Sequence, residues 1–136
     1  EYLDDDFFIT YGDVLTDVNL DLVKKINKKN NTALTLSAGQ PTSRFGLIDI
    51  KNAKVTEFKE KPKRKEWINI GYMYGNKKLL AYLKKDDVFE VDTMNRLVKS
   101  KQISAHKHSG EFFPVDNLKD LREINKIYKE GKAFWV

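Results

Sequence analysis

The sequence predicts an α/β protein with a mixed, mostly parallel sheet flanked by helices. Two observations carry this prediction. A strand, a helix and a second strand follow one another early in the chain, and further strand and helix patterns alternate up to a final amphipathic helix. A hairpin pattern in the middle of the chain adds antiparallel pairing, so the sheet is expected to be mixed. We expect residues 1–136 to form a single domain, because the chain is long enough to bury one core.

The first strand–helix–strand unit ends at residue 36. Phe7–Thr10 is aromatic and β-branched, and it lies between a run of aspartates and the pair Gly12-Asp13, which is typical of a strand. Asn19–Asn30 predicts a helix with apolar residues on one face and lysines on the other. Thr32–Leu36 reads as the second strand. A unit of this kind favours a parallel, right-handed crossover.

The remaining elements follow from the same two periodicities. They are a hairpin, a strand, two short helices, another strand and a last helix, in the order Gly46–Ile50 with Lys54–Lys59, Trp67–Tyr74, Lys77–Leu83, Asp92–Lys99, Gln102–His106 and Leu118–Lys129. Gly131 is expected to end the last helix, because glycine readily takes the left-handed conformation found there.

The composition excludes several classes of protein. Hydrophobic residues at 40% and charged residues at 33% are typical of a globular chain, and no apolar run approaches the ~20 residues of a membrane helix. The absence of cysteine excludes disulfide scaffolds and thiolate nucleophiles. No secretion leader precedes the first strand, so we expect a cytoplasmic protein. The chain begins with Glu1 rather than Met, which suggests the middle of a longer protein.

The net charge of +5 suits an anionic partner, and a small anionic substrate fits it as well as nucleic acid does. Only four of the 25 basic residues are Arg, the preferred reader of bases, which argues against nucleic acid. The basic run Lys61–Lys65 is interpreted as a solvated loop, and most aromatics as core. His106 and His108 share one strand face but lack a third metal ligand, so they are expected to be exposed strand side chains.

Four short stretches stand out, and each has a structural reading of its own. They are Tyr11-Gly12-Asp13, Phe58–Pro62, Trp67–Gly71 and Phe113–Asn117. The first could be a turn in which glycine supplies a positive φ, and the second a strand end stopped by proline. Glycine in the third could relieve crowding, and Asp116 in the fourth could cap the last helix. Taken singly, each stretch is explained by these readings.

Together and in this order, the four stretches resemble the sugar-phosphate nucleotidyltransferase family, whose members join a sugar 1-phosphate to a nucleoside triphosphate. Finer features are similar to the glucose-1-phosphate cytidylyltransferases: "SRFGLIDI", "WINIGYMY", "FPVDNLKDLREIN" and the closing "GKAFW". The resemblance covers essentially the whole chain. It implies part of a Rossmann-like fold, glucose 1-phosphate and CTP as substrates, a homo-oligomer, and neither nucleic acid nor a membrane as partner.

The resemblance also implies the metal site. The family's reaction brings two polyanions together, and Mg²⁺ held by one or two carboxylates suits that task. By resemblance, Asp13 and Asp116 are the metal ligands and catalytic residues, and Gly12 lets the backbone pass close to the ligand.

The remaining implied residues would bind the sugar phosphate. Lys61 is the catalytic residue that binds the phosphate, and Glu60 accepts hydrogen bonds from sugar hydroxyls. Gly71 leaves room for the sugar ring, with Asn69 as a nearby polar contact. Arg44 lies in a loop suited to meeting phosphate, but we assign it no role.

The chain departs from the family pattern in its glycines. The family's glycine-rich nucleotide loop is missing, because the seven glycines are scattered. We therefore expect the C-terminal part of such an enzyme. Asn117 and Ile70 also differ from the residues usual in the cytidylyltransferase branch. An alternative is a non-catalytic sugar-phosphate-binding or assembly module that lacks a nucleotide site.

Overall fold

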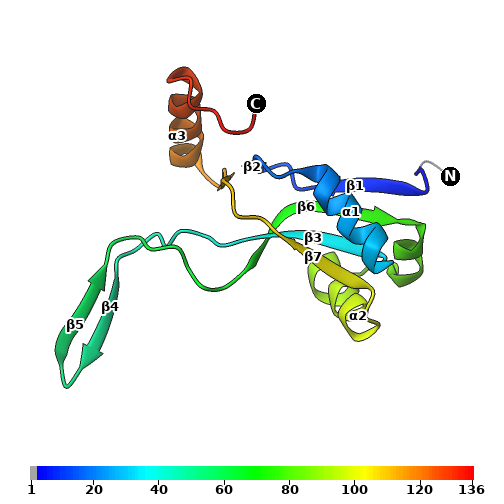
Figure 1. The fold of residues 1–136 in the computed structure, drawn as a ribbon, viewed down its shortest axis with the longest axis horizontal. Coiled ribbons are helices and arrows are strands. Elements are labelled where there is room, and N and C mark those ends of the chain that lie inside the picture. The colour runs from blue at the N-terminus through cyan, green and yellow to red at the C-terminus, as the bar shows by residue number, and fades with distance from the viewer. Residues whose placement is uncertain (1–2) are drawn as a thin grey trace.

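A four-stranded sheet forms the body of the molecule, from which a hairpin and a helix project (Figure 1). The computed structural model describes residues 3–136. The strand order is β1-β6-β3-β7, and the bounds are Asp6–Thr10, Ile68–Asn76, Leu34–Gly39 and Ile103–Lys107, respectively. The strands predicted in these four regions are confirmed, with ends that differ by at most three residues.

The pairing within the sheet corrects one expectation. The sheet is mixed, as expected, but β6 runs antiparallel to both of its neighbours, β1 and β3, and only β3 and β7 pair in parallel. The prediction of a mostly parallel sheet was therefore wrong. The strands of the first unit, β1 and β3, do run in the same direction, but they are not neighbours, because β6 comes later in the chain and lies between them.

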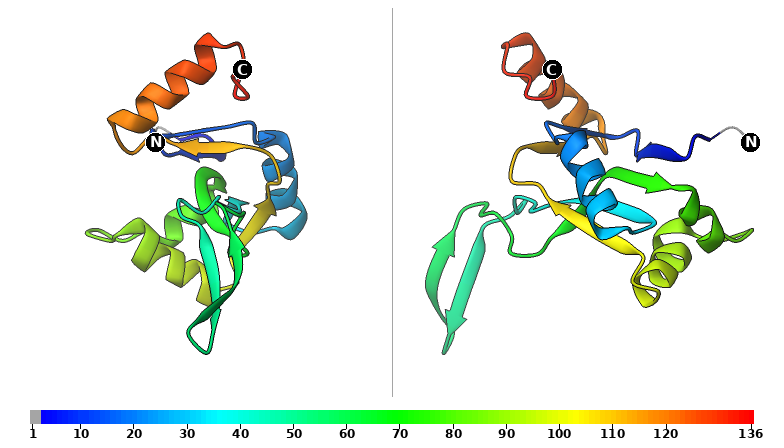
Figure 2. Two further views of the ribbon diagram at one scale, coloured as in Figure 1. Left: turned by 90° about the vertical axis from the view of Figure 1, so that its left-hand side faces the viewer. Right: turned by 45° about the vertical axis from the view of Figure 1, so that its right-hand side comes forward.

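The helices cover the two faces of this sheet (Figure 2). Asn27 of α1 (Leu20–Asn30) donates to Thr35 on β3 and to the Tyr74 carbonyl on β6, which places α1 over that face. The opposite face holds the apolar core, which comprises Ala33, Leu34, Met73, Leu79 and Leu97. This core is closed by a 3₁₀ helix (Lys77–Tyr82), a π-helical turn (Phe89–Thr93) and α2 (Met94–Lys99).

Two three-residue strands beside the sheet were not foreseen from the sequence. β2 (Val14–Thr16) and β8 (Phe112–Pro114) pair in antiparallel orientation, with Val14 opposite Pro114. They are too short to show a periodicity. α3 (Leu118–Lys129) begins after a connection of three residues from β8 and has the bounds that the sequence predicts. The short pair therefore joins the beginning of the chain to its last helix.

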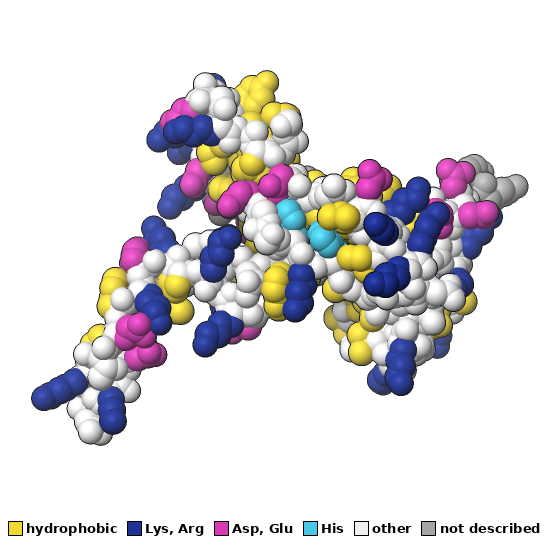
Figure 3. All heavy atoms as spheres, viewed as in Figure 1, with side chains coloured by type: hydrophobic (Ala, Val, Ile, Leu, Met, Phe, Trp, Pro, Cys, Tyr) yellow, Lys and Arg dark blue, Asp and Glu magenta, His cyan; other side chains and the backbone are white. Residues whose placement is uncertain are grey.

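The predicted hairpin is confirmed as β4 (Leu47–Lys51) and β5 (Lys54–Lys59), but every residue in it is exposed. Figure 3 shows hydrophobic side chains along this projection. The exposed aromatics include Phe45 and Phe58, so the expectation that most aromatics belong to the core does not hold for the hairpin. Within residues 3–136, none of the helices has the length and hydropathy needed to cross a membrane.

Candidate functional site

The β2–β8 pair brings two of the singled-out stretches together. The Val115 N–H donates a 2.7 Å hydrogen bond to the Asp13 carbonyl, which extends the ladder by one residue beyond Val14 and Pro114. Asp13 and Asp116, which are far apart in the sequence, therefore lie on adjoining segments of backbone. Both residues are exposed. Two accessible carboxylates on a paired backbone are a donor set that suits Mg²⁺, which takes oxygen ligands and is usually held by one or two carboxylates.

The structure does not support a capping role for Asp116 or a positive φ at Gly12. Asn117, rather than Asp116, is the N-cap of α3, because its side chain accepts from the Lys119 and Asp120 N–H groups. Gly12 lies in a turn but has no positive φ, and a Cβ there would meet nothing within 4 Å among the described residues. Neither the turn nor packing within this chain therefore demands a glycine at position 12.

Asp116 pairs with a residue to which the sequence assigned no role. Arg44 Nη2 lies 3.0 Å from Asp116 Oδ2, and the two side chains are 65% and 52% exposed. Arg44 belongs to the connection between β3 and β4. That connection is held in place because the Ser43 N–H donates to the Pro62 carbonyl at 2.9 Å. The ion pair thus links the β3–β4 connection to the segment before α3.

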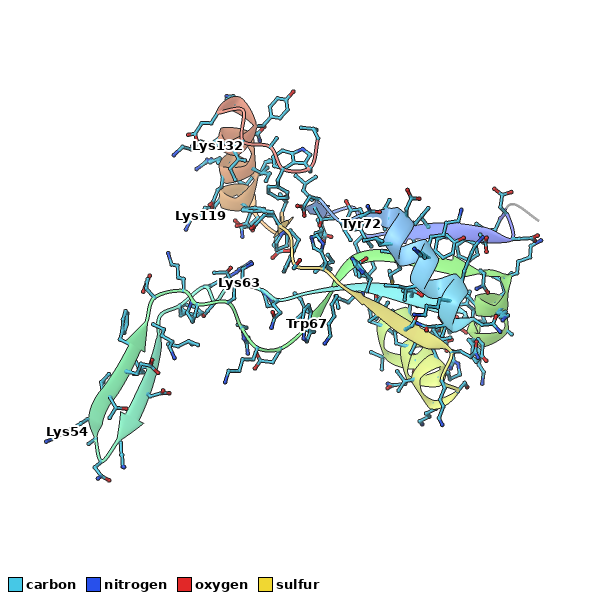
Figure 4. All side chains as sticks on the ribbon, viewed as in Figure 1. Lys54, Lys63, Trp67, Tyr72, Lys119 and Lys132 are labelled. Carbon is cyan, nitrogen blue, oxygen red and sulfur yellow. The ribbon has the colours of Figure 1, made fainter. Side chains whose placement is uncertain are left out.

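A cleft of about 680 Å³ lies between these connections and α3. Arg44, Lys61, Lys63 and Lys119 line it, together with acidic residues of α3. Figure 4 shows Lys63 on the connection from β5 to β6 and Lys119 at the beginning of α3, on the two sides of the cleft. The four cations outnumber the three carboxylates of the lining, those of Glu111, Asp120 and Glu123, so the cleft keeps a positive balance that suits a phosphorylated ligand.

Lys61 has an uncommon backbone conformation in this cleft. Its φ of 42° lies in the left-handed region, which costs a non-glycine residue about 1–2 kcal/mol. The neighbouring β3–β4 connection holds this conformation, because Thr42 forms a β-bridge with Lys63 of the β5–β6 connection. Glu60 Oε1 lies 3.9 Å from Lys61 Nζ, and both side chains are exposed. Strained residues of this kind cluster at ligand sites.

Asn69 and Gly71 lie elsewhere, on β6 beside the end of β1. Gly71 has a φ of 78°, and a Cβ on it would come 2.7 Å from Tyr11 Cδ2, so the space beside this glycine holds the Tyr11 ring. The Asn69 Oδ1 accepts from the Gly71 N–H at 3.1 Å. Tyr11 immediately precedes Gly12, so this contact fixes the backbone that leads into Asp13. Of the predicted site residues within the described chain, only Lys61 lines the cleft directly.

Tyr11 is held at its other end by Glu90 from the π-helical turn. The Tyr11 hydroxyl donates a 2.7 Å hydrogen bond to Glu90 Oε1. Burial, followed by the bond to this carboxylate, raises the pKa of Tyr11 to about 12. The same bond lowers the pKa of the Glu90 carboxyl. Tyr11 is therefore a neutral hydroxyl that ties β1 to the opposite side of the sheet.

The two histidines differ from the expectation that both are exposed. His108 is only 8% exposed and lies just beyond β7, where its Nε2 is 2.9 Å from Asp17 Oδ1. Asp17 Oδ1 also accepts from the Glu111 N–H at 2.8 Å, so this contact closes the loop before β8. Burial and the neighbouring His108 lower the pKa of His106. Within residues 3–136, no three His, Asp or Glu side chains gather closely enough to hold a metal ion.

Sequence reasoning missed the contributions of Arg44, Asp17 and Glu90. Arg44 carried a weak signal, because it is one of only four arginines and lies near a conspicuous motif. Asp17 and Glu90 carried none, since their partners His108 and Tyr11 are more than 70 residues away along the chain.

The sequence of this chain was compared with family models and with known proteins, and the matches agree on one family. The model of the nucleotidyl transferase family matches residues 1–131. A glucose-1-phosphate cytidylyltransferase of Salmonella typhimurium is 32% identical over 99% of this chain and 54% of its own length. A Bacillus subtilis protein assigned as a glucose-1-phosphate cytidylyltransferase is 29% identical over 97% of this chain and 53% of its own. The chain thus spans about half the length of these relatives.

Solved structures share the fold. A Bacillus anthracis protein assigned as a glucose-1-phosphate thymidylyltransferase, in complex with a sucrose, superimposes with a TM-score of 0.64 at 19% identity, over 96% of this chain and 58% of that one. HddC from Yersinia pseudotuberculosis gives 0.60 at 20% identity, over 93% and 57%. These likenesses show the fold alone, whereas the family model covers nearly the whole sequence. The chain therefore belongs to the nucleotidyl transferase family.

Proposed function

We propose that this chain is the sugar-phosphate-binding and metal-binding portion of an enzyme that joins glucose 1-phosphate to CTP. The products would be a nucleotide sugar and pyrophosphate. The names of the relatives that are 29% and 32% identical support this choice of sugar and base. The C-terminal position of this portion in its enzyme, its assembly into a homo-oligomer and its cytoplasmic location stay predictions.

The observation that carries the proposal is the β2–β8 pair. It sets Asp13 beside the segment that holds Asp116, and Asp116 is tied through Arg44 to the cleft that Lys61 lines. The carboxylates proposed for the metal and the lysine proposed for the phosphate are therefore connected through the Arg44–Asp116 ion pair. Nucleotidyl transfer needs this combination, since two polyanions must approach each other and the developing charge must be neutralised.

The reaction asks for positioning more than for a strong base. A phosphate oxygen of the sugar phosphate attacks the α-phosphorus of the nucleotide in line, and pyrophosphate leaves. Mg²⁺, when bound by Asp13 and Asp116, would neutralise phosphate charge. Lys61 would hold the sugar phosphate as a point charge, because its ammonium donates in three directions. Its left-handed backbone, pinned by the β3–β4 connection, keeps the side chain directed into the cleft.

The other predicted residues have supporting roles in this proposal. Gly12 would admit the ligand, since nothing else in the described chain requires a glycine there. Glu60 would accept hydrogen bonds from sugar hydroxyls beside Lys61. Asn69 and Gly71 would act through Tyr11, whose position they fix next to Gly12.

Calorimetric titration with glucose 1-phosphate, with and without Mg²⁺, tests the proposal. Wild type should bind saturably, and Lys61→Gln should bind about tenfold or more weakly, because it loses a charge-assisted hydrogen bond. Lys65→Gln is the matched control, since Lys65 is an exposed lysine of the same basic run that does not line the cleft. Equal losses in both variants, or none in either, would contradict the role of Lys61.

A further inference from the structure

We propose that Arg44 holds Asp116 in the free protein and leaves it for the sugar phosphate when a divalent metal ion binds. The inference rests on the proposed function, because it takes Asp116 as a metal ligand and the Lys61 cleft as the phosphate site. Its starting point is the ion pair itself, in which Arg44 Nη2 lies 3.0 Å from Asp116 Oδ2.

The ion pair and a metal ion compete for the same carboxylate. A divalent cation needs the carboxylate oxygens as ligands and repels a guanidinium in contact with them. Both partners of the pair are more than half exposed, at 65% and 52%. Exposed ion pairs of this kind change an equilibrium by a factor of about five at most, so a metal ion displaces Arg44 at little cost.

The released side chain has a destination within reach. Arg44 lines the same cleft as Lys61 and Lys63, and the backbone that leads into it is fixed by two hydrogen bonds. The Ser43 N–H donates to the Pro62 carbonyl, and the Arg64 N–H donates to the Pro41 carbonyl, each at 2.9 Å. Only the side chain has to move. The planar guanidinium then offers two parallel donors to a phosphate, which a lysine cannot do.

This exchange couples the two ligands. Metal binding at Asp116 frees the cation that the phosphate needs, and phosphate binding in the cleft frees the carboxylate that the metal needs. Each ligand therefore tightens the other by the same factor, as thermodynamic linkage requires. If Arg44 only bound the phosphate and had no effect on Asp116, replacing Arg44 would not change the affinity for metal measured without phosphate. That difference separates the proposal from a simple binding role.

The test is a set of calorimetric titrations of the 136-residue chain with Mg²⁺ alone, glucose 1-phosphate alone, and glucose 1-phosphate at saturating Mg²⁺. Arg44→Gln should bind Mg²⁺ alone more tightly, by up to about fivefold. It should bind glucose 1-phosphate in the presence of Mg²⁺ about tenfold or more weakly, and Arg44→Lys should recover part of this loss. Arg64→Gln is the matched control, because Arg64 pairs with Glu66 outside this cleft. Circular dichroism verifies that each variant is folded.

The outcomes separate the two proposals. If Arg44→Gln binds Mg²⁺ as wild type does, the exchange is wrong even where phosphate binding weakens, because Arg44 is then only a phosphate ligand. If it binds both ligands as wild type does, the ion pair is merely structural and the inference alone fails. If wild type binds no glucose 1-phosphate under any condition, the proposed function fails and takes the inference with it.

Discussion

Replacing Gly71 by alanine should destabilise the fold more than any other glycine-to-alanine change at a positive φ. The added Cβ would lie 2.7 Å from Tyr11 Cδ2 and 3.0 Å from Tyr11 Cβ, and the residue would keep a φ of 78°. The left-handed backbone costs alanine about 1–2 kcal/mol, and overpacking against a held ring costs about 1–3 kcal/mol. The free energy of unfolding should therefore fall by about 2–5 kcal/mol.

The Tyr11 ring cannot simply move aside, because its hydroxyl is bonded to Glu90 and its N–H to the Gly71 carbonyl at 2.8 Å. With a urea m-value of about 2 kcal/mol/M, the middle of the usual range, the unfolding midpoint should fall by about 1–2.5 M. The assay is urea unfolding followed by circular dichroism and by the fluorescence of the two tryptophans, one of which is Trp67.

Gly131→Ala supplies the matched control. Gly131 has a φ of 68°, but a Cβ there would meet nothing within 4 Å among the described residues, so only the backbone cost of about 1–2 kcal/mol applies. The difference between the two variants isolates the contact with Tyr11. Equal midpoint shifts in Gly71→Ala and Gly131→Ala would refute the reasoning.

Two further predictions concern polar groups of the body. Tyr11→Phe removes the bond to Glu90 and should lower the free energy of unfolding by about 1 kcal/mol below pH 10. Because the pKa of Tyr11 is raised in the folded state, wild type should lose this contribution as the pH rises from 10 to 12, and the difference between the two proteins should disappear there. Urea unfolding across that pH range checks the prediction, and a constant difference would contradict it. Asn27→Leu should lower the free energy of unfolding by about 2–3 kcal/mol, since Asn27 is 2% exposed and its amide is hydrogen-bonded to Thr35 and Asn76. The control, Asn125→Leu at an exposed position, should change the unfolding midpoint little. Similar midpoint shifts in both variants would contradict the role of the buried network.

The sequence predicted the longer elements well, because helices and strands impose a periodicity that a single segment displays. α3 has the predicted bounds, and α1 begins one residue after the predicted start, with Asn19 as its N-cap. Strand order was not accessible in this way. The apolar pattern of β6 shows that it is buried, but it does not say that β1 and β3 lie on its two sides. Asn27 shows the same limit, since its burial depends on partners in β3 and β6.

The same distinction between local patterns and distant pairings applies to the candidate site. The motifs singled out Asp13, Asp116 and Lys61 because each follows or precedes a strong local pattern. The contacts between them depend on β2 and β8, which are too short to recognise, and on Arg44, whose partner is 72 residues away. Local patterns could therefore identify the residues, whereas their arrangement follows from pairings between distant segments.

The central position of β6 also determines when the sheet can form during synthesis. β1, α1 and β3 leave the ribosome long before the strand that pairs with both β1 and β3, since Asp6 pairs with Asn76 and Leu34 with Gly75. Until β6 has been made, β1 and β3 lack the partner that lies between them and can pair with a neighbouring polypeptide instead. A nascent chain whose emerged part ends before residue 68 should therefore depend on chaperones, and one whose emerged part includes residue 76 should need them less.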